Sequence, residues 1–188
     1  MLKIILQSTH PVVPFNEPAR DLRIQNKPLW LAQRDALAPF ATREMELPPN
    51  GRLPQTREAC LVYRDNLWFD EFYIRAFLAE AVKRKRASRA ALSINDPAFR
   101  EHCLPLSNSY TPAGELYLAD LWYYPNGPEP DADPLVIDLQ AREIGYYHIP
   151  TYMAAETGEL VYWVPLRSLI AIDSWVHIFV ADMIFGLF

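Results

Sequence analysis

The sequence predicts an α/β fold in which a predominantly parallel or mixed sheet is flanked by helices. Short apolar runs at residues 4–6, 59–63 and 88–94 have the length and composition of buried strands. Helical patterns occupy residues 28–40 and 69–86, between those runs. This strand–helix–strand alternation implies right-handed crossovers, and therefore parallel pairing, in the first half of the chain.

Each of the two expected helices has an apolar face. The first begins with Pro28, a residue suited to the first helical position, and ends at Pro39. Helical spacing predicts these inward residues for it: Leu29, Ala32, Ala36 and Leu37. For the second helix the predicted inward residues are Phe72, Ala76, Leu78, Ala79 and Val82. The basic run 83–86 near its end suits the helix macrodipole and is read as a solvated helix end.

The rest of the chain is expected to alternate loops and strands. Residues 41–57 and 125–134 are polar and rich in proline, which predicts loops. Further strands are expected at residues 116–124, 135–139, 144–149 and 160–165, the last two around a turn at 156–159. Residues 168–188 are mostly apolar, and they predict either a buried strand with a closing helix or a chain that continues into a further domain.

Composition excludes several classes of function. The chain has 188 residues, a formal net charge of −5, 6 glycines, 17 prolines and 2 cysteines, and its length suits a single domain spanning residues 1–188. A mildly acidic chain is not typical of nucleic-acid binders. Cys60 and Cys103 are too few for a disulfide framework or a four-cysteine zinc site. The apolar run at the N-terminus is too short for a signal peptide, so we expect a cytoplasmic protein without membrane contact.

Polar residues suited to ligand binding follow two of the expected strands. In open α/β sheets, ligands bind at the carboxyl ends of the strands. Segment 7–27, after the first strand, contains four of these residues: Arg20, Asp21, Arg23 and Lys27. Asp65 follows the apolar run 59–63. Arginines in a long loop favour polyphosphate binding, and an aspartate at a strand end favours Mg²⁺.

Both groups also have a purely structural interpretation. Arg20, Asp21 and Arg23 could pair with one another at the surface, where ion pairs need no function. Asp65 could instead be the N-cap of the helix that follows it. Spacing alone leaves both interpretations open.

Several of these segments resemble sugar-1-phosphate nucleotidyltransferases, and in particular a divergent group that often carries a left-handed β-helix after the transferase domain. Residues 16–30 (NEPARDLRIQNKPLW) are similar to the RP-x-x-D-x-R segment of that group, and Asn26-Lys27-Pro28 matches the N-K-P that opens a helix in the wider family. Residues 62–66 (VYRDN) resemble the strand that ends in the family's Mg²⁺-binding aspartate. Residues 95–97 (NDP) are similar to a further family feature, and residues 175–182 (WVHIFVAD) fall where the family has a second metal ligand.

The resemblance implies a Rossmann-like, nucleotide-diphospho-sugar transferase-like fold. It implies Mg²⁺-dependent transfer of a nucleotidyl group from a nucleoside triphosphate to a sugar phosphate, with release of pyrophosphate. Arg20 and Asp65 would be catalytic, and Asp65 and Asp182 would bind the metal. The implied phosphate-binding residues are Arg20, Asp21, Arg23 and Lys27. A C-terminal β-helix domain or a second copy of the chain would be the protein partner.

One departure from the family pattern favours a different function. The glycine-rich loop of the family falls on residues 8–13 (STHPVV), which contain no glycine. Backbone amides approach phosphates most closely where no side chain intervenes. The alternative is therefore a catalytically inactive member of the same fold that serves as a binding or assembly module.

Overall fold

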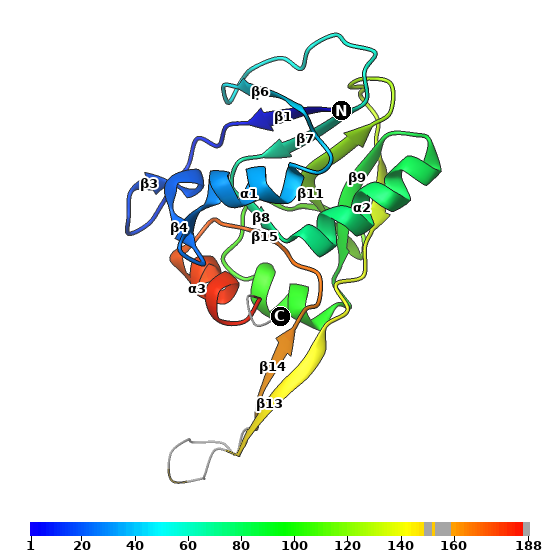
Figure 1. Ribbon diagram of the computed structural model, residues 1–188. Helices are drawn as coiled ribbons and strands as arrows, with labels where there is room; N and C mark the ends of the chain where they lie inside the picture. Colours follow the sequence, from blue (N-terminus) through cyan, green and yellow to red (C-terminus); the bar gives the residue numbers. More distant parts are fainter. Residues whose placement is uncertain (149–151, 153–158, 186–188) are drawn as a thin grey trace.

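The computed structural model describes residues 1–148, 152 and 159–185, and it is built on a seven-stranded sheet. The strands follow the order β12-β9-β11-β7-β1-β6, with β10 paired to β11 (Figure 1). Their bounds are Leu2–Leu6 for β1, Arg43–Leu47 for β6, Cys60–Arg64 for β7, Ser88–Ser93 for β9, Thr111–Ala113 for β10, Leu116–Tyr124 for β11 and Asp133–Val136 for β12.

The sheet is mixed in direction. β1 pairs in parallel with both β6 and β7, and β12 pairs in parallel with β9. β11 runs antiparallel between β7 and β9. The predicted α/β class, with a parallel or mixed sheet flanked by helices, is confirmed.

Two helices cover one face of this sheet. Helix α1 (Leu29–Leu37) and helix α2 (Glu71–Arg84) both lie in front of it in Figure 1. α1 starts one residue after Pro28 and buries Leu29, Gln33 and Leu37. The carboxylate of Asp70 caps α2 by accepting a hydrogen bond from the amide of Tyr73 at 2.7 Å.

The apolar face predicted for α2 is wrong in part. Phe72, Ala79 and Val82 were expected to point inward, but all three are exposed, Phe72 and Val82 by 64% and 53%. The buried side of the helix consists of Tyr73, Ile74, Phe77, Leu78 and Ala81. The helix carries apolar residues on both sides of its circumference, so periodicity alone does not identify the side that meets the sheet.

The two faces of the sheet are packed differently, as alternation along a strand requires. Ile5 and Tyr63 belong to the large core under the helices. Their neighbours Ile4 and Val62 belong to a smaller apolar cluster on the opposite face, together with Cys60.

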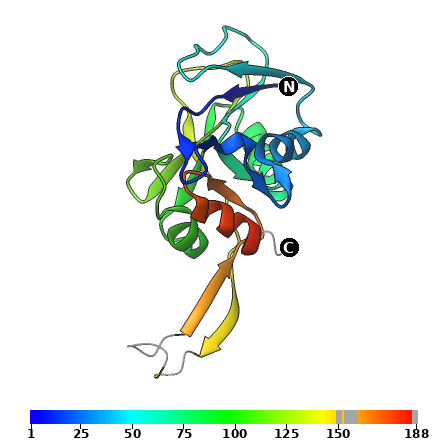
Figure 2. The same ribbon diagram turned by 90° about the vertical axis from the view of Figure 1, so that its left-hand side faces the viewer.

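The second half of the chain adds smaller units to this body. β8 (Leu67–Phe69) pairs antiparallel with β15 (Leu169–Ala171), and helix α3 (Trp175–Met183) follows. β13 (Arg142–His148) and β14 (Glu159–Val164) form a hairpin that projects from the body in both ribbon views (Figures 1 and 2). The expected strand and closing helix near the C-terminus are confirmed. Most of the expected turn at 156–159 lies outside the described residues.

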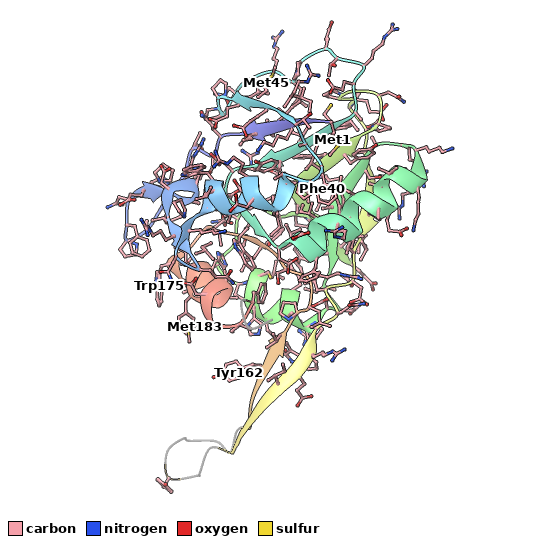
Figure 3. All side chains as sticks on the ribbon, viewed as in Figure 1. Met1, Phe40, Met45, Tyr162, Trp175 and Met183 are labelled. Atoms are coloured by element: carbon pink, nitrogen blue, oxygen red, sulfur yellow. The ribbon has the colours of Figure 1, made fainter. Side chains whose placement is uncertain are left out.

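Residues 41–57 were expected to be a loop, but they contain the edge strand β6. Its sequence, REMEL, has three charged residues, and its first four residues are exposed. The side chain of Met45, in the middle of the strand, lies at the outer edge of the molecule (Figure 3). The strand therefore lacks the apolar pattern of a buried strand and is specified by its parallel register with β1.

The segment between β1 and α1 is ordered by short hairpins. β2 (Pro11–Val12) pairs with β3 (Glu17–Pro18), and β4 (Arg23–Ile24) pairs with β5 (Lys27–Pro28). A 3₁₀ turn, Ala19–Asp21, connects the two hairpins, and a π-helical turn, Phe99–Cys103, follows β9. No helix among the described residues is long and apolar enough to span a bilayer.

Gly127 fixes one loop against another. Its φ is +91°, and a Cβ there would collide with the carbonyl oxygen of Thr56.

We expect Gly127→Ala to lower the free energy of unfolding by about 2 kcal/mol or more, because the backbone strain and the collision with Thr56 add. Gly114 also has a positive φ, +67°, but it has open space around it, so Gly114→Ala should cost only about 1 kcal/mol. Urea unfolding measures both, and equal losses would contradict this packing.

Candidate functional site

Asp65 lies where the parallel strands β1 and β7 end. The register places Leu6 opposite Arg64, and the amide of Asp65 donates to the carbonyl oxygen of Leu6 at 3.0 Å. The Asp65 Oδ1 atom accepts a hydrogen bond from the amide of Ser8 at 2.7 Å. One carboxylate therefore connects the end of β7 to the loop that leaves β1.

Arg20 reaches the same carboxylate from the 3₁₀ turn. Its Nη1 lies 3.7 Å from Asp65 Oδ2, and both Nη atoms donate to the Glu46 carboxylate of β6 at 3.1 Å. Gln7 Nε2 also donates to Glu46, at 3.3 Å. The structure thus brings together Arg20 and Asp65, two residues singled out from separate segments of the sequence, and adds Glu46 from the unexpected strand.

Burial and charge act in opposite directions on Asp65. Its side chain is only 4% exposed. Burial raises the pKa of the Asp65 carboxyl, and the Ser8 amide and then Arg20 oppose that rise. The hydrogen bond from Arg20 lowers the pKa of Glu46, and the same bond raises the pKa of Arg20. Arg20 is therefore held mainly by Glu46 and shared with Asp65.

The turn after Asp65 is fixed from the helix side. Gln33 is 2% exposed in the middle of α1, and its Nε2 donates to the carbonyl oxygens of Asp65, at 3.1 Å, and Leu67, at 2.7 Å. Without the Gln33 side chain, these two buried carbonyl oxygens would lose this hydrogen-bond donor. The sequence carried a signal for this role, because Gln33 lies midway between the inward residues Leu29 and Leu37.

The alternative role of Asp65 as a helix cap is wrong. Asp70, not Asp65, is the N-cap of α2. Asp65 is separated from that helix by β8. Its carboxylate is directed instead to Ser8 and Arg20.

The other predicted site residues lie outside the Arg20–Asp65 contact. Arg23 Nη1 donates to the carbonyl oxygen of Asn26 at 3.5 Å, and Lys27 Nζ lies 2.8 Å from Asp35 Oδ2. Asp21 is exposed. Asp182, on α3, accepts a hydrogen bond from the amide of Gln25 at 2.5 Å, at the turn between β4 and β5. No hydrogen bond or ion pair found among the described residues joins any of these four to Asp65.

The residues around Asp65 do not fit a magnesium ion in this arrangement. Mg²⁺ needs accessible oxygen ligands in an octahedral shell. Asp65 Oδ1 is bonded to the Ser8 amide, and Oδ2 faces the guanidinium of Arg20, which would repel a cation. Within residues 1–148, 152 and 159–185, no three His, Cys, Asp or Glu side chains gather as a metal site.

A cavity adjoins this strand end. It has a volume of about 590 Å³ and lies between the loop 8–13 and the segment 108–111. Arg64 of β7 and Asp120 of β11 also line it, as does Asp173, which follows β15. We refer to this cavity as the cleft. Its walls come from both halves of the chain.

Asp173 organises one wall of the cleft. Its Oδ2 accepts hydrogen bonds from the Ser107 hydroxyl at 2.7 Å and from the amides of Asn108 and Ser109 at 2.9 and 3.1 Å. Its Oδ1 accepts from the Ser109 hydroxyl at 2.7 Å and from Asn66 Nδ2 at 2.9 Å. No local motif marks Asp173 in the sequence, because its donors lie more than sixty positions away.

A buried histidine supports the same wall. The amide of Asp173 donates to His177 Nδ1 at 3.1 Å, and His177 Nε2 donates to the carbonyl oxygen of Pro105 at 2.8 Å. These bonds require the neutral tautomer with its proton on Nε2. Burial also lowers the pKa of His177 and favours that neutral form.

Comparisons with known proteins give distant structural similarity. No family model and no curated protein matches this sequence. A protein assigned as a glucose-1-phosphate thymidylyltransferase from Bacillus anthracis, solved with sucrose, aligns at 13% identity and a TM-score of 0.45 over 66% of this chain and 70% of its own.

Two further structures also align with this chain at low sequence identity. HddC from Yersinia pseudotuberculosis, complexed with GMP-PN, aligns at 11% identity and a TM-score of 0.45 over 97% of this chain and 98% of its own. A structure titled mannose-1-phosphate geranyltransferase from Thermus thermophilus aligns at 14% identity and a TM-score of 0.43, over 66% of this chain and 57% of its own. All three TM-scores lie below 0.5, so the fold class stated above rests on the strand order itself.

The two aspartates near the C-terminus should differ sharply in their effect on stability. Asp173→Asn replaces an acceptor oxygen with an NH₂ group among five donors, so we expect it to lower the free energy of unfolding by about 2–4 kcal/mol. Asp182→Asn is the matched control, because Asp182 is exposed and accepts one hydrogen bond from the part of the chain that the structure describes; its cost should stay below about 1 kcal/mol. Urea denaturation at neutral pH measures both. A control as damaging as Asp173→Asn would disprove the role assigned to Asp173.

Proposed function

We propose that this chain is a sugar-1-phosphate nucleotidyltransferase-like domain whose cleft binds a nucleotide. The proposal rests above all on the position of the cleft, which is lined by Arg64 at the end of β7 and by the loop 8–13 that follows β1. Ligands of open α/β sheets bind outside the carboxyl ends of the strands, and the cleft opens there. The motif resemblance of residues 16–30 and 62–66 supports the same conclusion.

The size and chemistry of the cleft suit a ligand of this kind. Its volume, about 590 Å³, falls within the range of small-molecule sites. Its lining combines hydroxyl and amide side chains, such as Ser8 and Asn108, and the cationic Arg64 with two acids, Asp120 and Asp173. The hydroxyl, amide and guanidinium groups can donate hydrogen bonds to phosphate and sugar oxygens.

The finer form of the proposal is transfer to a sugar phosphate. The oxygen of the sugar phosphate would attack the α-phosphate of a nucleoside triphosphate, and pyrophosphate would leave. Such a reaction depends mainly on in-line positioning and on neutralising charge. We assign no metal-dependent step here, because Arg20 faces the carboxylate that a metal ion would use.

A second candidate is the same domain acting as a binding module without catalysis. Two observations favour it: Arg20 is the counter-ion of Asp65, and the loop 8–13 has no glycine to cradle a triphosphate. In this form the nucleotide, the sugar phosphate or their product would be a ligand rather than a substrate. A β-helix domain or a second copy of the chain stays a prediction as its protein partner.

Thermal unfolding with nucleotides tests the proposal. We expect at least one nucleoside triphosphate to raise the midpoint, since a ligand at 100 times its Kd stabilises a protein by about 2.7 kcal/mol. No shift with any nucleotide, with or without Mg²⁺, would contradict nucleotide binding.

Pyrophosphate release, measured with sugar phosphates and Mg²⁺, separates the two forms. In the binding form the thermal shift should not need Mg²⁺, and no pyrophosphate should appear. If Asp65 has the catalytic role that the resemblance implies, Asp65→Asn should abolish release in the transferase form while leaving the fold nearly unchanged, because an asparagine oxygen can still accept from the Ser8 amide. Asp131→Asn, in the exposed loop before β12, is the control carboxylate and should leave release unaltered.

A further inference from the structure

Three charged side chains meet beside the cleft, and two of them, Arg64 and Asp120, line it. Arg64 Nε donates to Asp120 Oδ2 at 2.6 Å, and Arg89 Nη2 donates to Asp120 Oδ1 at 2.8 Å. They come from three adjacent strands, β7, β9 and β11. We call these three residues the arginine cluster. It contains two guanidinium groups and one carboxylate, so it carries one net positive charge.

The two arginines of the cluster are used differently. Arg89 is 17% exposed in its side chain and is engaged at two of its three nitrogens: its Nε donates to the carbonyl oxygen of Ala119 at 2.9 Å, and Nη2 also donates to Thr111 Oγ1 at 3.3 Å. Its guanidinium carbon lies 4.8 Å from the ring centre of Trp122. Arg89 is therefore a fixed positive charge behind Asp120.

Arg64 has hydrogen-bond donors that no described residue uses. Its side chain is 32% exposed and lines the cleft. Only Nε is engaged, so neither Nη atom of Arg64 has a hydrogen-bond partner among the residues that the structure describes. By contrast, both Nη atoms of Arg20 are bound to Glu46. The two Nη groups of Arg64 form one edge of a planar fork, the geometry that binds two oxygens of a phosphate.

The surroundings of Arg64 favour an anion. Asp120 is already shared with Arg89, so it cannot neutralise both guanidinium groups. Asp173, the other acid of the cleft, is occupied by five hydrogen bonds from Ser107, Asn108, Ser109 and Asn66. No ion pair within the described ranges joins Asp173 to either arginine.

We propose that Arg64 is the phosphate-binding residue of the cleft, with Asp120 as the positioning residue that holds its guanidinium and Arg89 as the charge that keeps the cluster positive. The expected ligand is a phosphate group, whether part of an inorganic polyphosphate, a nucleotide or a sugar phosphate. This places phosphate recognition on the face of the sheet opposite the Arg20–Asp65 contact. The inference deepens the proposed function but can be tested independently of it.

Isothermal titration of the full chain with tripolyphosphate at low salt is the direct test. We expect Arg64→Gln to weaken binding about 10- to 100-fold, because charge-assisted hydrogen bonds are lost. Arg64→Lys should fall between wild type and Arg64→Gln, because it keeps the charge without the fork. Arg75→Gln is the control, since Arg75 is an exposed arginine of α2 paired with Glu71, and it should bind as wild type does. Wild-type affinity in Arg64→Gln, or no binding to wild type, would overturn the inference.

Two further measurements keep the inference separate from folding and from the proposed function. If Arg64→Gln does not fold, the side-chain nitrogen resonances of Arg64 in the wild type must shift on titration with tripolyphosphate; unmoved resonances would refute the inference. Nucleotides and sugar phosphates then compete against tripolyphosphate. Binding of tripolyphosphate alone would support Arg64 and disprove nucleotide binding. A nucleotide that stabilises wild type and Arg64→Gln equally would support the proposed function and overturn the inference.

Discussion

The carboxylate of Asp65 is the constraint on which the strand-end architecture depends. β1 and β7 are parallel neighbours, so their chains end at the same edge of the sheet and must leave in different directions. The hydrogen bond from the Ser8 amide to Asp65 fixes the departure of the first chain, and Gln33 fixes that of the second through the carbonyl of Asp65. Arg20 then supplies the positive charge that a buried carboxylate needs.

Side chains alternate between the two faces of a sheet, and this alternation gives the neighbours Arg64 and Asp65 different roles. Arg64 and Asp65 are adjacent, and so they point to opposite faces of the sheet. Asp65 meets Arg20 on the face covered by α1, where Arg20 and Glu46 line a small cavity of about 270 Å³. Arg64 meets Asp120 on the other face and lines the cleft. The domain therefore has one closed side at this edge, where the charges are paired, and one open side, where neither Nη atom of Arg64 has a hydrogen-bond partner among the described residues.

The elements that the sequence predicted correctly are those with a local signal. β1, β7 and α2 are marked by apolar runs or helical spacing, and the aspartate at a strand end follows from the chain order alone. β6 has no such signal, because an edge strand with one apolar neighbour needs few apolar residues. The α2 face was partly wrong because Phe72 is apolar yet exposed.

The candidate site was harder to predict than the fold, for a physical reason. Arg20 and Asp65 were found because each follows a strand, but Glu46, Asp120 and Asp173 depend on strand order and on contacts between distant segments. Asp173 receives donors from residues 107–109, and Asp120 meets arginines from two other strands. Asp182 is a residue that the resemblance did single out, as a metal ligand. In the structure its carboxylate accepts a hydrogen bond from Gln25, in the turn between β4 and β5.

A double-mutant cycle between Arg20→Gln and Asp65→Asn most directly tests whether Arg20 is the counter-ion of the buried carboxylate. Urea unfolding of wild type, both single variants and the double variant gives the coupling free energy. If the guanidinium compensates the charge of Asp65, the two changes should couple by about 1 kcal/mol or more. Additivity within about 0.3 kcal/mol would show that Asp65 does not depend on Arg20 and would contradict the account.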